Sequence, residues 1–421
     1  MEQHSLAIQI IESLRKGIPP QLGTDLYSVG NEKLIQGIET YHLSGIHERG
    51  IIRFMSGSWG AGKTHFFRLL REVAFKNGCL VSNVELNVND AALNKFERVF
   101  SSIVRNVVSS THYSERAASD AAPFGRVIQE CLFYLATGTR KTSNEITYDD
   151  YSKAREILMD DRSLDIDFKK IVDAYWKTFL PESAEPAIQE QTREEIVQWF
   201  SGEGTIGGYR KRFGVNKVVA RENAKLMLQS LAGFVRASGH RGLLILFDEA
   251  EQSYSIMRKS ALKDAHNNLK SLIDNIETLP GLFLLYATTP DFFSDPKHGI
   301  VVYGALAGRI GKPESRQPRA LDTIWNFDAV ETNLSDYQSS ARKIRAVYAT
   351  GYPHVVTNLP TEEETDLFVA NLFRSHPSLA AVRFWRVLVT AVTAHFDDHL
   401  EGEVRPTETV YRDVMERLRE E

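Results

Sequence analysis

The sequence predicts an α/β fold, with a mostly parallel sheet as its core, a large helical insertion and a helical C-terminal part. The apolar run at residues 243–247 is typical of a strand buried on both faces, and the mostly apolar segments at residues 51–55, 79–86 and 282–287 are expected to be further strands. A glycine-rich turn follows the first run and leads into a helical segment that begins at residue 65. Much of the remaining chain has apolar residues at helical spacing.

The glycine-rich turn is a complete G-x-x-x-x-G-K-[ST] motif, made of Gly57, Ser58, Trp59, Gly60, Ala61, Gly62, Lys63 and Thr64. Its glycines let consecutive backbone N–H groups point at an anion, and the helix from His65 onward adds a favourable dipole. We expect Lys63 to reach the β- and γ-phosphates and the Thr64 hydroxyl to bind Mg²⁺. A purely structural turn is the alternative. The motif predicts a P-loop that binds a triphosphate through residues 57–65.

Two carboxylates follow the apolar run at residues 243–247. Open α/β sheets bind ligands at the carboxyl ends of their strands, where Asp248 and Glu249 would lie. We expect Asp248 to hold Mg²⁺ through water opposite Thr64, and Glu249 to orient and deprotonate the attacking water. The alternative is a solvated strand end. With the P-loop, these residues predict an enzyme that hydrolyses ATP.

Thr288 and Thr289 follow the next apolar run. One of these hydroxyls is expected to contact the γ-phosphate or its attacking water, and Thr289 is slightly less favoured because Pro290 restricts its backbone. The alternative is that both hydroxyls only cap the strand end. This polar position is typical of ring-forming AAA+ ATPases.

An arginine after this strand could serve a neighbouring subunit. Arg309 is the candidate to reach in trans into the nucleotide site of a second copy, with Arg316 and Arg319 as substitutes. A solvated surface arginine is the alternative. The hypothesis predicts a homo-oligomer.

We expect three regions. Residues 1–45 form an N-terminal helical linker whose turn at Gly30 packs near the adenine. Residues 46–317 form the ATPase core, including a helical insertion at about 90–235, because the 248 − 64 = 184 residues between Thr64 and Asp248 far exceed the roughly 30 of one βα unit. The insertion is expected to bind a partner or substrate; alternatively, it only enlarges the core.

Residues 318–421 are expected to form a C-terminal helical lid. A capping box at residues 361–364 opens one helix, and a second helix starting at residue 377 carries Arg383. Arg383 is expected to reach the γ-phosphate from the lid, although an arginine on a helix exterior is often simply solvated.

The composition excludes several classes of protein. The chain has 421 residues, 43% hydrophobic and 25% charged, and its apolar runs are too short to span a membrane. Its two cysteines form no C-x-x-C pair, which argues against a disulfide framework or a cysteine zinc site and favours a reducing cytoplasm. A net charge of −5 gives no overall attraction to nucleic acid, so DNA would be held by local loops or a ring of subunits.

The chain resembles the P-loop ATP-binding proteins of the BREX phage-defence systems. The resemblance rests on residues 55–66 (MSGSWGAGKTHF), 246–251 (LFDEAE) and 286–293 (YATTPDFF), covers nearly the whole chain, and by length favours a short member. It implies an AAA+ fold akin to origin-recognition ATPases, with ATP and Mg²⁺ as cofactors. It also implies double-stranded DNA and other defence proteins, such as a helicase or methyltransferase, as partners in a bacterial cytoplasm.

These observations predict an AAA+ ATPase of an anti-phage system, which hydrolyses ATP to drive oligomeric assembly or remodelling on DNA. ATP is the expected nucleotide because no N-K-x-D motif for guanine follows. One alternative is a nucleotide-gated scaffold. Another is a signalling NTPase that binds partner proteins without acting on DNA.

Overall fold

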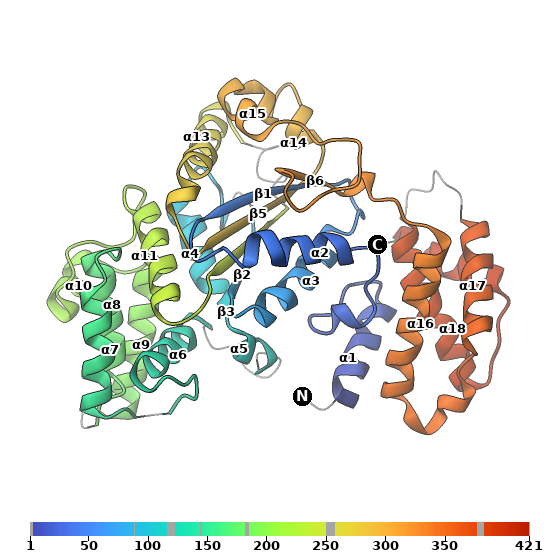
Figure 1. The fold of residues 1–421 in the computed structure, drawn as a ribbon, viewed down its shortest axis with the longest axis horizontal. Coiled ribbons are helices and arrows are strands. Elements are labelled where there is room, and N and C mark those ends of the chain that lie inside the picture. The colour runs from blue at the N-terminus through green and yellow to red at the C-terminus, as the bar shows by residue number, and fades with distance from the viewer. Residues whose placement is uncertain are drawn as a thin grey trace.

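The computed structural model describes residues 3–87, 89–115, 123–143, 145–181, 185–249, 257–376 and 383–420. Its centre is a six-stranded sheet in the order β3-β2-β4-β5-β1-β6 (Figure 1). The strands are β1 (Ile51–Ser56), β2 (Leu80–Glu85), β3 (Val107–Val108), β4 (Leu243–Asp248), β5 (Leu282–Thr288) and β6 (Ile324–Asn326). Neighbouring strands are parallel except β2 and β3. The predicted mixed α/β fold is confirmed, and it is compatible with a P-loop fold.

Alternate strand residues face opposite sides of the sheet, as the pleat requires. Met55 of β1 and Phe283 of β5 pack in one cluster with Phe66 and Leu70 of α3 (Lys63–Lys76). The same cluster includes residues of α2 (Glu32–Ile38), and η2 (Glu39–Leu43) continues directly from α2. The helix that follows the glycine-rich loop is therefore fixed against β1 and β5 by buried apolar contacts.

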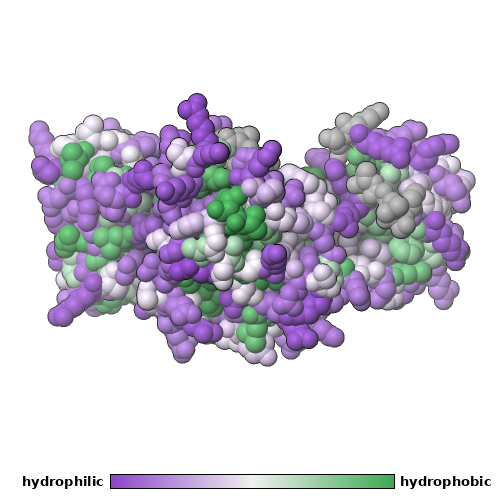
Figure 2. All heavy atoms as spheres, turned by 90° about the horizontal axis from the view of Figure 1, so that it is seen from above, coloured by the Kyte–Doolittle hydropathy of each residue, from purple (hydrophilic) through white to green (hydrophobic). Residues whose placement is uncertain are grey.

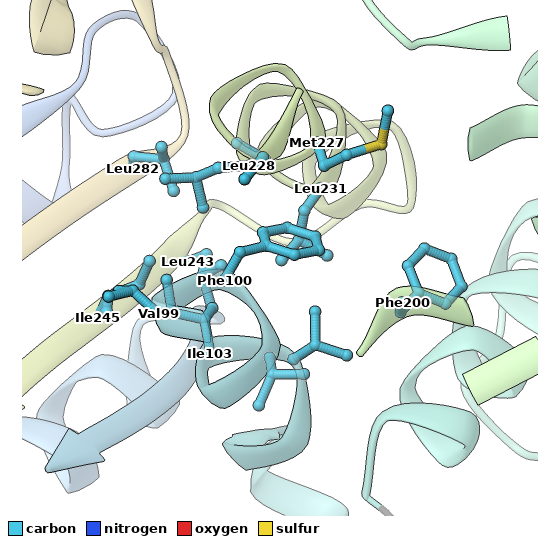
Figure 3. Close-up of a cluster of buried hydrophobic side chains, with 14 of the residues drawn as sticks. Val99, Phe100, Ile103, Phe200, Met227, Leu228, Leu231, Leu243, Ile245 and Leu282 are labelled. Carbon is cyan, nitrogen blue, oxygen red and sulfur yellow. The ribbon is translucent and has the colours of Figure 1, made fainter. Parts of the chain in front are cut away.

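The other face of the sheet is covered by helices of the insertion. Figure 3 shows Phe100 of α4 (Phe96–Asn106) and Leu231 of α11 (Ala224–Ala237) gathered with Leu243 and Ile245 of β4 and Leu282 of β5. Because this buried cluster is continuous, α4 and α11 extend the sheet's own core. This part of the insertion therefore adds to the core of the sheet, and the role of the insertion in binding a partner stays a prediction.

The outer helices of the insertion lie on the left of Figure 1, and the first of them contacts the edge of the sheet at β3. They are α6 (Pro123–Thr137), α7 (Tyr148–Asp160), α8 (Ile166–Lys177), α9 (Pro186–Phe200) and α10 (Ile206–Phe213), and α5 (Ser110–Glu115) lies below β3. Trp176 and Trp199 are fully buried among them. The outer helices therefore have a packed core of their own, continuous with that of the sheet.

One long helix, α13 (Lys259–Asn275), and several short helices connect β4, β5 and β6 along the top of Figure 1. The short helices are η4 (Ile276–Thr278), α14 (Asp291–Ser294), η5 (Ile300–Val302) and α15 (Gly304–Ile310). β6 then pairs with β1 and ends in η6 (Phe327–Ala329). The expectation of an entirely helical pattern after residue 318 is wrong at β6, because a three-residue strand is too short to show an alternating pattern.

The C-terminal helices form a separate bundle, on the right of Figure 1. They are α16 (Leu334–Gly351), η7 (Pro353–Asn358), α17 (Glu362–Ser375), α18 (Phe384–Glu401) and α19 (Thr407–Glu420). The capping box at Thr361 and Glu364 is confirmed. The expected helix start at residue 377 lies outside the described residues, and Arg383 directly precedes α18.

The first helix, α1 (Gln3–Arg15), packs in the apolar cluster of this C-terminal bundle through Ile10, Ile11 and Leu14. The chain then crosses to the sheet through η1 (Thr24–Leu26) and α2. Both ends of the described chain thus contribute to one helical bundle beside the sheet. None of the helices within the described residues is long and apolar enough to cross a membrane.

Candidate nucleotide site

The candidate site lies where β1, β5 and β4 end side by side. β5 lies between β1 and β4, so the residues after all three strands meet at one edge of the sheet. The Gly57 N–H donates to the Thr288 carbonyl at 3.1 Å. The Thr64 hydroxyl donates to a carboxylate oxygen of Asp248 at 3.4 Å. Residues that are 184 positions apart in the sequence are thus brought into contact.

The glycine-rich loop (residues 57–64) has the curled backbone that the motif predicts. Gly60 and Gly62 have φ of 77° and 90°, which other residues rarely adopt. A Cβ at Gly57 would lie 3.0 Å from that of Ala61 and 3.2 Å from that of Phe327. The loop therefore needs glycine at two positions for conformation and at a third for space.

Lys63 begins α3 and is buried against its own loop. Its ammonium donates to the Gly57 carbonyl at 2.6 Å and to the Ser58 carbonyl at 3.3 Å. Trp59 is 64% exposed, and its ring centroid lies 5.9 Å from the Lys63 Nζ. A positive charge is therefore held inside the loop by backbone oxygens, where an incoming phosphate can replace them as its partner.

Asp248 and Glu249 end β4 in a strained turn. Glu249 has φ of 53°, the one positive value among the described non-glycine residues, and its N–H donates to Asp248 at 3.0 Å. Such strain is typical of functional turns. Burial raises the pKa of the Asp248 carboxyl, opposed by the Glu249 N–H and the nearby Lys63. A bound cation would reverse this shift by favouring the charged carboxylate.

Thr288 and Thr289 both lie at the end of β5, between the loop and Asp248. Thr288 is fully buried, pairs in register with Ser56, and has a hydroxyl without a hydrogen-bond partner among the described residues. Thr289 is 7% exposed. The structure brings both threonines to the site edge.

His65 contacts the N-terminal segment. Its ring nitrogens hydrogen-bond with the Tyr27 hydroxyl at 3.2 Å and the Ser28 hydroxyl at 2.6 Å. Burial lowers the pKa of His65 to about 4, so the ring is neutral at physiological pH. Ser340 and Lys343 of α16 in turn donate to the Tyr27 and Ser28 carbonyls. His65 thus connects the start of α3 to the C-terminal bundle.

Gly30 follows this segment with φ of 83°, and no atom lies within 4 Å of where its Cβ would be. The space beside it is therefore open, as an adenine-side turn would need.

Asp328 is the site residue that the sequence analysis missed. One of its carboxylate oxygens accepts the Ser58 N–H at 2.9 Å, and the other accepts the Ser58 hydroxyl at 2.5 Å and the Arg383 guanidinium at 3.0 Å. Arg383 also donates to the Ser58 hydroxyl. Asp328 lies 270 residues from Ser58 and belongs to no motif, so no sequence signal indicated it. Arg383, by contrast, reaches the loop from the C-terminal bundle.

Within one chain, Arg309 makes none of the contacts described above for the candidate nucleotide site. It lies on α15 and forms an ion pair with Asp274 of α13, a contact that raises the pKa of its guanidinium. Arg316 is paired with Asp322 at 2.8 Å, while Arg319 is exposed. Of the three candidate arginines, the structure leaves only the side chain of Arg319 without an ion pair among the described residues.

The oxygens of Thr64 and Asp248 suit a magnesium ion. Mg²⁺ prefers hard oxygen ligands, and it is commonly held by one or two protein groups together with substrate phosphates and water. Their separation of 3.4 Å lets both approach one cation, directly or through water. The described residues contain no group of three or more histidine, cysteine, aspartate or glutamate side chains that could hold a metal.

In a comparison with protein families, residues 3–376 match the family described as BREX system ATP-binding protein BrxC/D. Searches of curated proteins and of solved structures found no match. The match includes the glycine-rich loop, both carboxylates of β4 and the threonines of β5. It supports ATP as the ligand and phage defence as the setting. The chain belongs to the BREX system ATP-binding protein BrxC/D family.

Proposed function

We propose that this protein is an AAA+ ATPase that hydrolyses ATP to assemble or remodel a phage-defence complex on DNA. The observation that carries the proposal is the meeting of Lys63, Thr64, Asp248 and Glu249 at one sheet edge. Lys63 and the loop N–H groups bind the phosphates, while Thr64 and Asp248 hold Mg²⁺. Glu249 orients and deprotonates the attacking water.

The threonines of β5 complete the proposed reaction site. The position of β5 between β1 and β4 puts Thr288 and Thr289 between the loop and Asp248. One hydroxyl there can hydrogen-bond to the γ-phosphate or to the attacking water. The Thr288 hydroxyl is buried and has no hydrogen-bond partner among the described residues, which favours Thr288.

We further propose that the protein acts as a homo-oligomer with an arginine in trans. The α13–α15 face, seen from above in Figure 2, has a hydrophobic area near its middle. On η5 of this face, Val301 and Val302 are 39% and 46% exposed, and Arg309 follows on α15. A neighbouring copy bound on this face would cover the valines. The nucleotide of that neighbouring copy could then attract Arg309 away from Asp274.

The insertion offers a surface for DNA. Arg210 and Lys211 of α10 are exposed, and neither side chain has an ion pair among the described residues. Beside them, Lys170, Lys177 and Arg212 line a cavity of about 500 Å³, where they pair with Asp167, Asp173 and Glu195. The charges available to the phosphates of a DNA backbone are therefore those of Arg210 and Lys211. A helicase or methyltransferase of the same system would be a further partner.

A nucleotide-gated scaffold is the second candidate function. This function is favoured by the contacts of His65 with Tyr27 and Ser28. The carbonyls of Tyr27 and Ser28 in turn accept hydrogen bonds from side chains of α16. Through them, a shift of α3 on ATP binding would reach the C-terminal bundle without hydrolysis. In this case turnover would be incidental to the binding of partner proteins.

The test is phosphate release from ATP, measured across protein concentrations with and without duplex DNA. The proposal predicts that turnover per subunit rises with concentration, that duplex DNA stimulates it, and that Arg309→Ala abolishes the concentration dependence. Lys312→Ala, an exposed nearby cation, is the matched control and should leave all three unchanged. Constant turnover per subunit, unaffected by Arg309→Ala, would refute the oligomer.

A further inference from the structure

Asp328 places a negative charge directly against a loop that is proposed to bind an anion. It follows β6, the neighbour of β1, and accepts two hydrogen bonds from Ser58. A carboxylate in this position opposes the phosphates of a nucleotide unless its charge is balanced. In the structure the balancing group is Arg383, at 3.0 Å.

The carboxylate is held firmly by its surroundings. The Asn326 side chain accepts the Asp328 N–H at 3.1 Å. The preceding Phe327 is buried and packs edge-on against Phe66 of α3, with ring centroids 5.0 Å apart. Asp328 therefore moves only together with β6 and the glycine-rich loop.

Arg383 is the more exposed partner of this pair. Its side chain is 50% exposed, and it crosses the loop so closely that a Cβ at Gly60 would lie 3.0 Å from its Cγ. It also directly precedes α18 of the C-terminal bundle. A change of partner by Arg383 would therefore move the bundle relative to the loop.

An ion pair this exposed is weak, whereas arginine binds phosphate oxygens through stronger charge-assisted hydrogen bonds. A γ-phosphate in the loop would thus compete successfully with Asp328 for Arg383. A nucleoside diphosphate has no γ-phosphate and would leave Arg383 on Asp328. We propose that Asp328 is a positioning residue that holds Arg383 on the empty loop and releases it to the terminal phosphate of a nucleoside triphosphate. Asp328 thereby sets the preference for triphosphate over diphosphate.

This inference rests on the proposed nucleotide binding, and Asp328→Asn tests it. Asparagine keeps the shape and can still accept the Ser58 N–H, but it removes the charge that competes for Arg383. We expect the variant to bind a non-hydrolysable ATP analogue with Mg²⁺ about fivefold more tightly, and ADP with less than a twofold change. Glu331→Gln removes the same charge from an exposed residue nearby and should change neither affinity.

A double-mutant cycle with Arg383→Gln tests whether Asp328 acts through Arg383. Arg383→Gln alone should lower the triphosphate preference, and adding Asp328→Asn to it should give no further gain. Affinities can be followed by calorimetry or by the fluorescence of the exposed Trp59. If Asp328→Asn does not fold, the loss of preference in Arg383→Gln remains the test.

The outcomes separate the two proposals. Failure of the wild-type protein to bind either nucleotide would refute the proposed function itself. If the wild-type protein binds both nucleotides, an unchanged ratio of affinities in Asp328→Asn overturns only the role of Asp328. An equal loss of affinity for both nucleotides in Asp328→Asn also overturns the role of Asp328, because Asp328 would then only stabilise the loop.

Discussion

Replacement of Gly62 by alanine tests the glycine-rich loop directly. Gly62 has φ 90° and ψ 12°, and no heavy atom lies within 4 Å of the position that a Cβ would take. The substitution therefore introduces backbone strain without a clash, at a cost of about 1–2 kcal/mol in the free energy of unfolding. Relief of that strain requires rotation of the peptide between Gly62 and Lys63, which turns N–H donors away from a bound phosphate. We expect ATP affinity to fall at least about tenfold, or roughly 1.4 kcal/mol.

The chain contains a closely matched control at Gly402. This residue has φ 81° and ψ 13°, also with open space at its Cβ position, but it ends α18 in the C-terminal bundle. Gly402→Ala should lose a similar free energy of unfolding and keep wild-type ATP affinity. Denaturant unfolding and calorimetric titration of both variants measure the two quantities. The reasoning is refuted if Gly62→Ala binds ATP like the wild type, or if both variants lose affinity equally.

Two further predictions concern the surface and the pH dependence. Replacing both Arg210 and Lys211 by glutamate should reduce the slope of log K against log salt for binding of duplex DNA by about 2, because two phosphate contacts are lost. Replacing the exposed Lys33 and Lys312 by glutamate should leave that slope unchanged. Fluorescence anisotropy measures the slopes, and equal slopes for the two double variants would contradict a role of Arg210 and Lys211 in DNA binding. Burial lowers the pKa of five histidines in the folded chain. Below about pH 6.5 these histidines are therefore protonated in the unfolded chain but stay neutral in the folded chain until the pH reaches their lowered pKa. The free energy of unfolding should therefore fall by at least about 3 kcal/mol between pH 6.5 and 5, and a flat profile in denaturant titrations would contradict this. The lowered pKa values are about 4 for His42, His65, His266 and His395 and about 3 for His240.

The sequence predicted the strands and the loop where the demands on each residue are local. The apolar run before Asp248 became β4, with five buried residues, and Gly60 and Gly62 of the loop adopt the positive φ that glycine tolerates easily. Thr64 and Asp248 were expected to lie on opposite sides of one cation, and they lie in contact. These features follow from burial and backbone sterics, which short patterns record.

Features that depend on distant contacts were not predictable. Asp328 joins the site because β6 pairs with β1, and neither the three-residue strand nor its following turn has a distinctive pattern. The contacts of the His65 ring with Tyr27 and Ser28 come from packing that no spacing rule encodes, and a contact of His65 with the nucleotide stays a prediction. Whether Arg309 acts in trans also depends on a second chain, so it stays a prediction.

We propose that Glu249, at the carboxyl end of β4, is required for the hydrolysis of ATP bound in the glycine-rich loop. The most direct measurement is ATP binding and phosphate release in the same samples of the wild-type protein and Glu249→Gln. Glutamine keeps the size of the side chain but cannot accept the proton of the attacking water. We predict that the variant binds ATP as tightly as the wild type and releases phosphate at least about a hundredfold more slowly. Equal rates of phosphate release in the two proteins would contradict the assignment of Glu249.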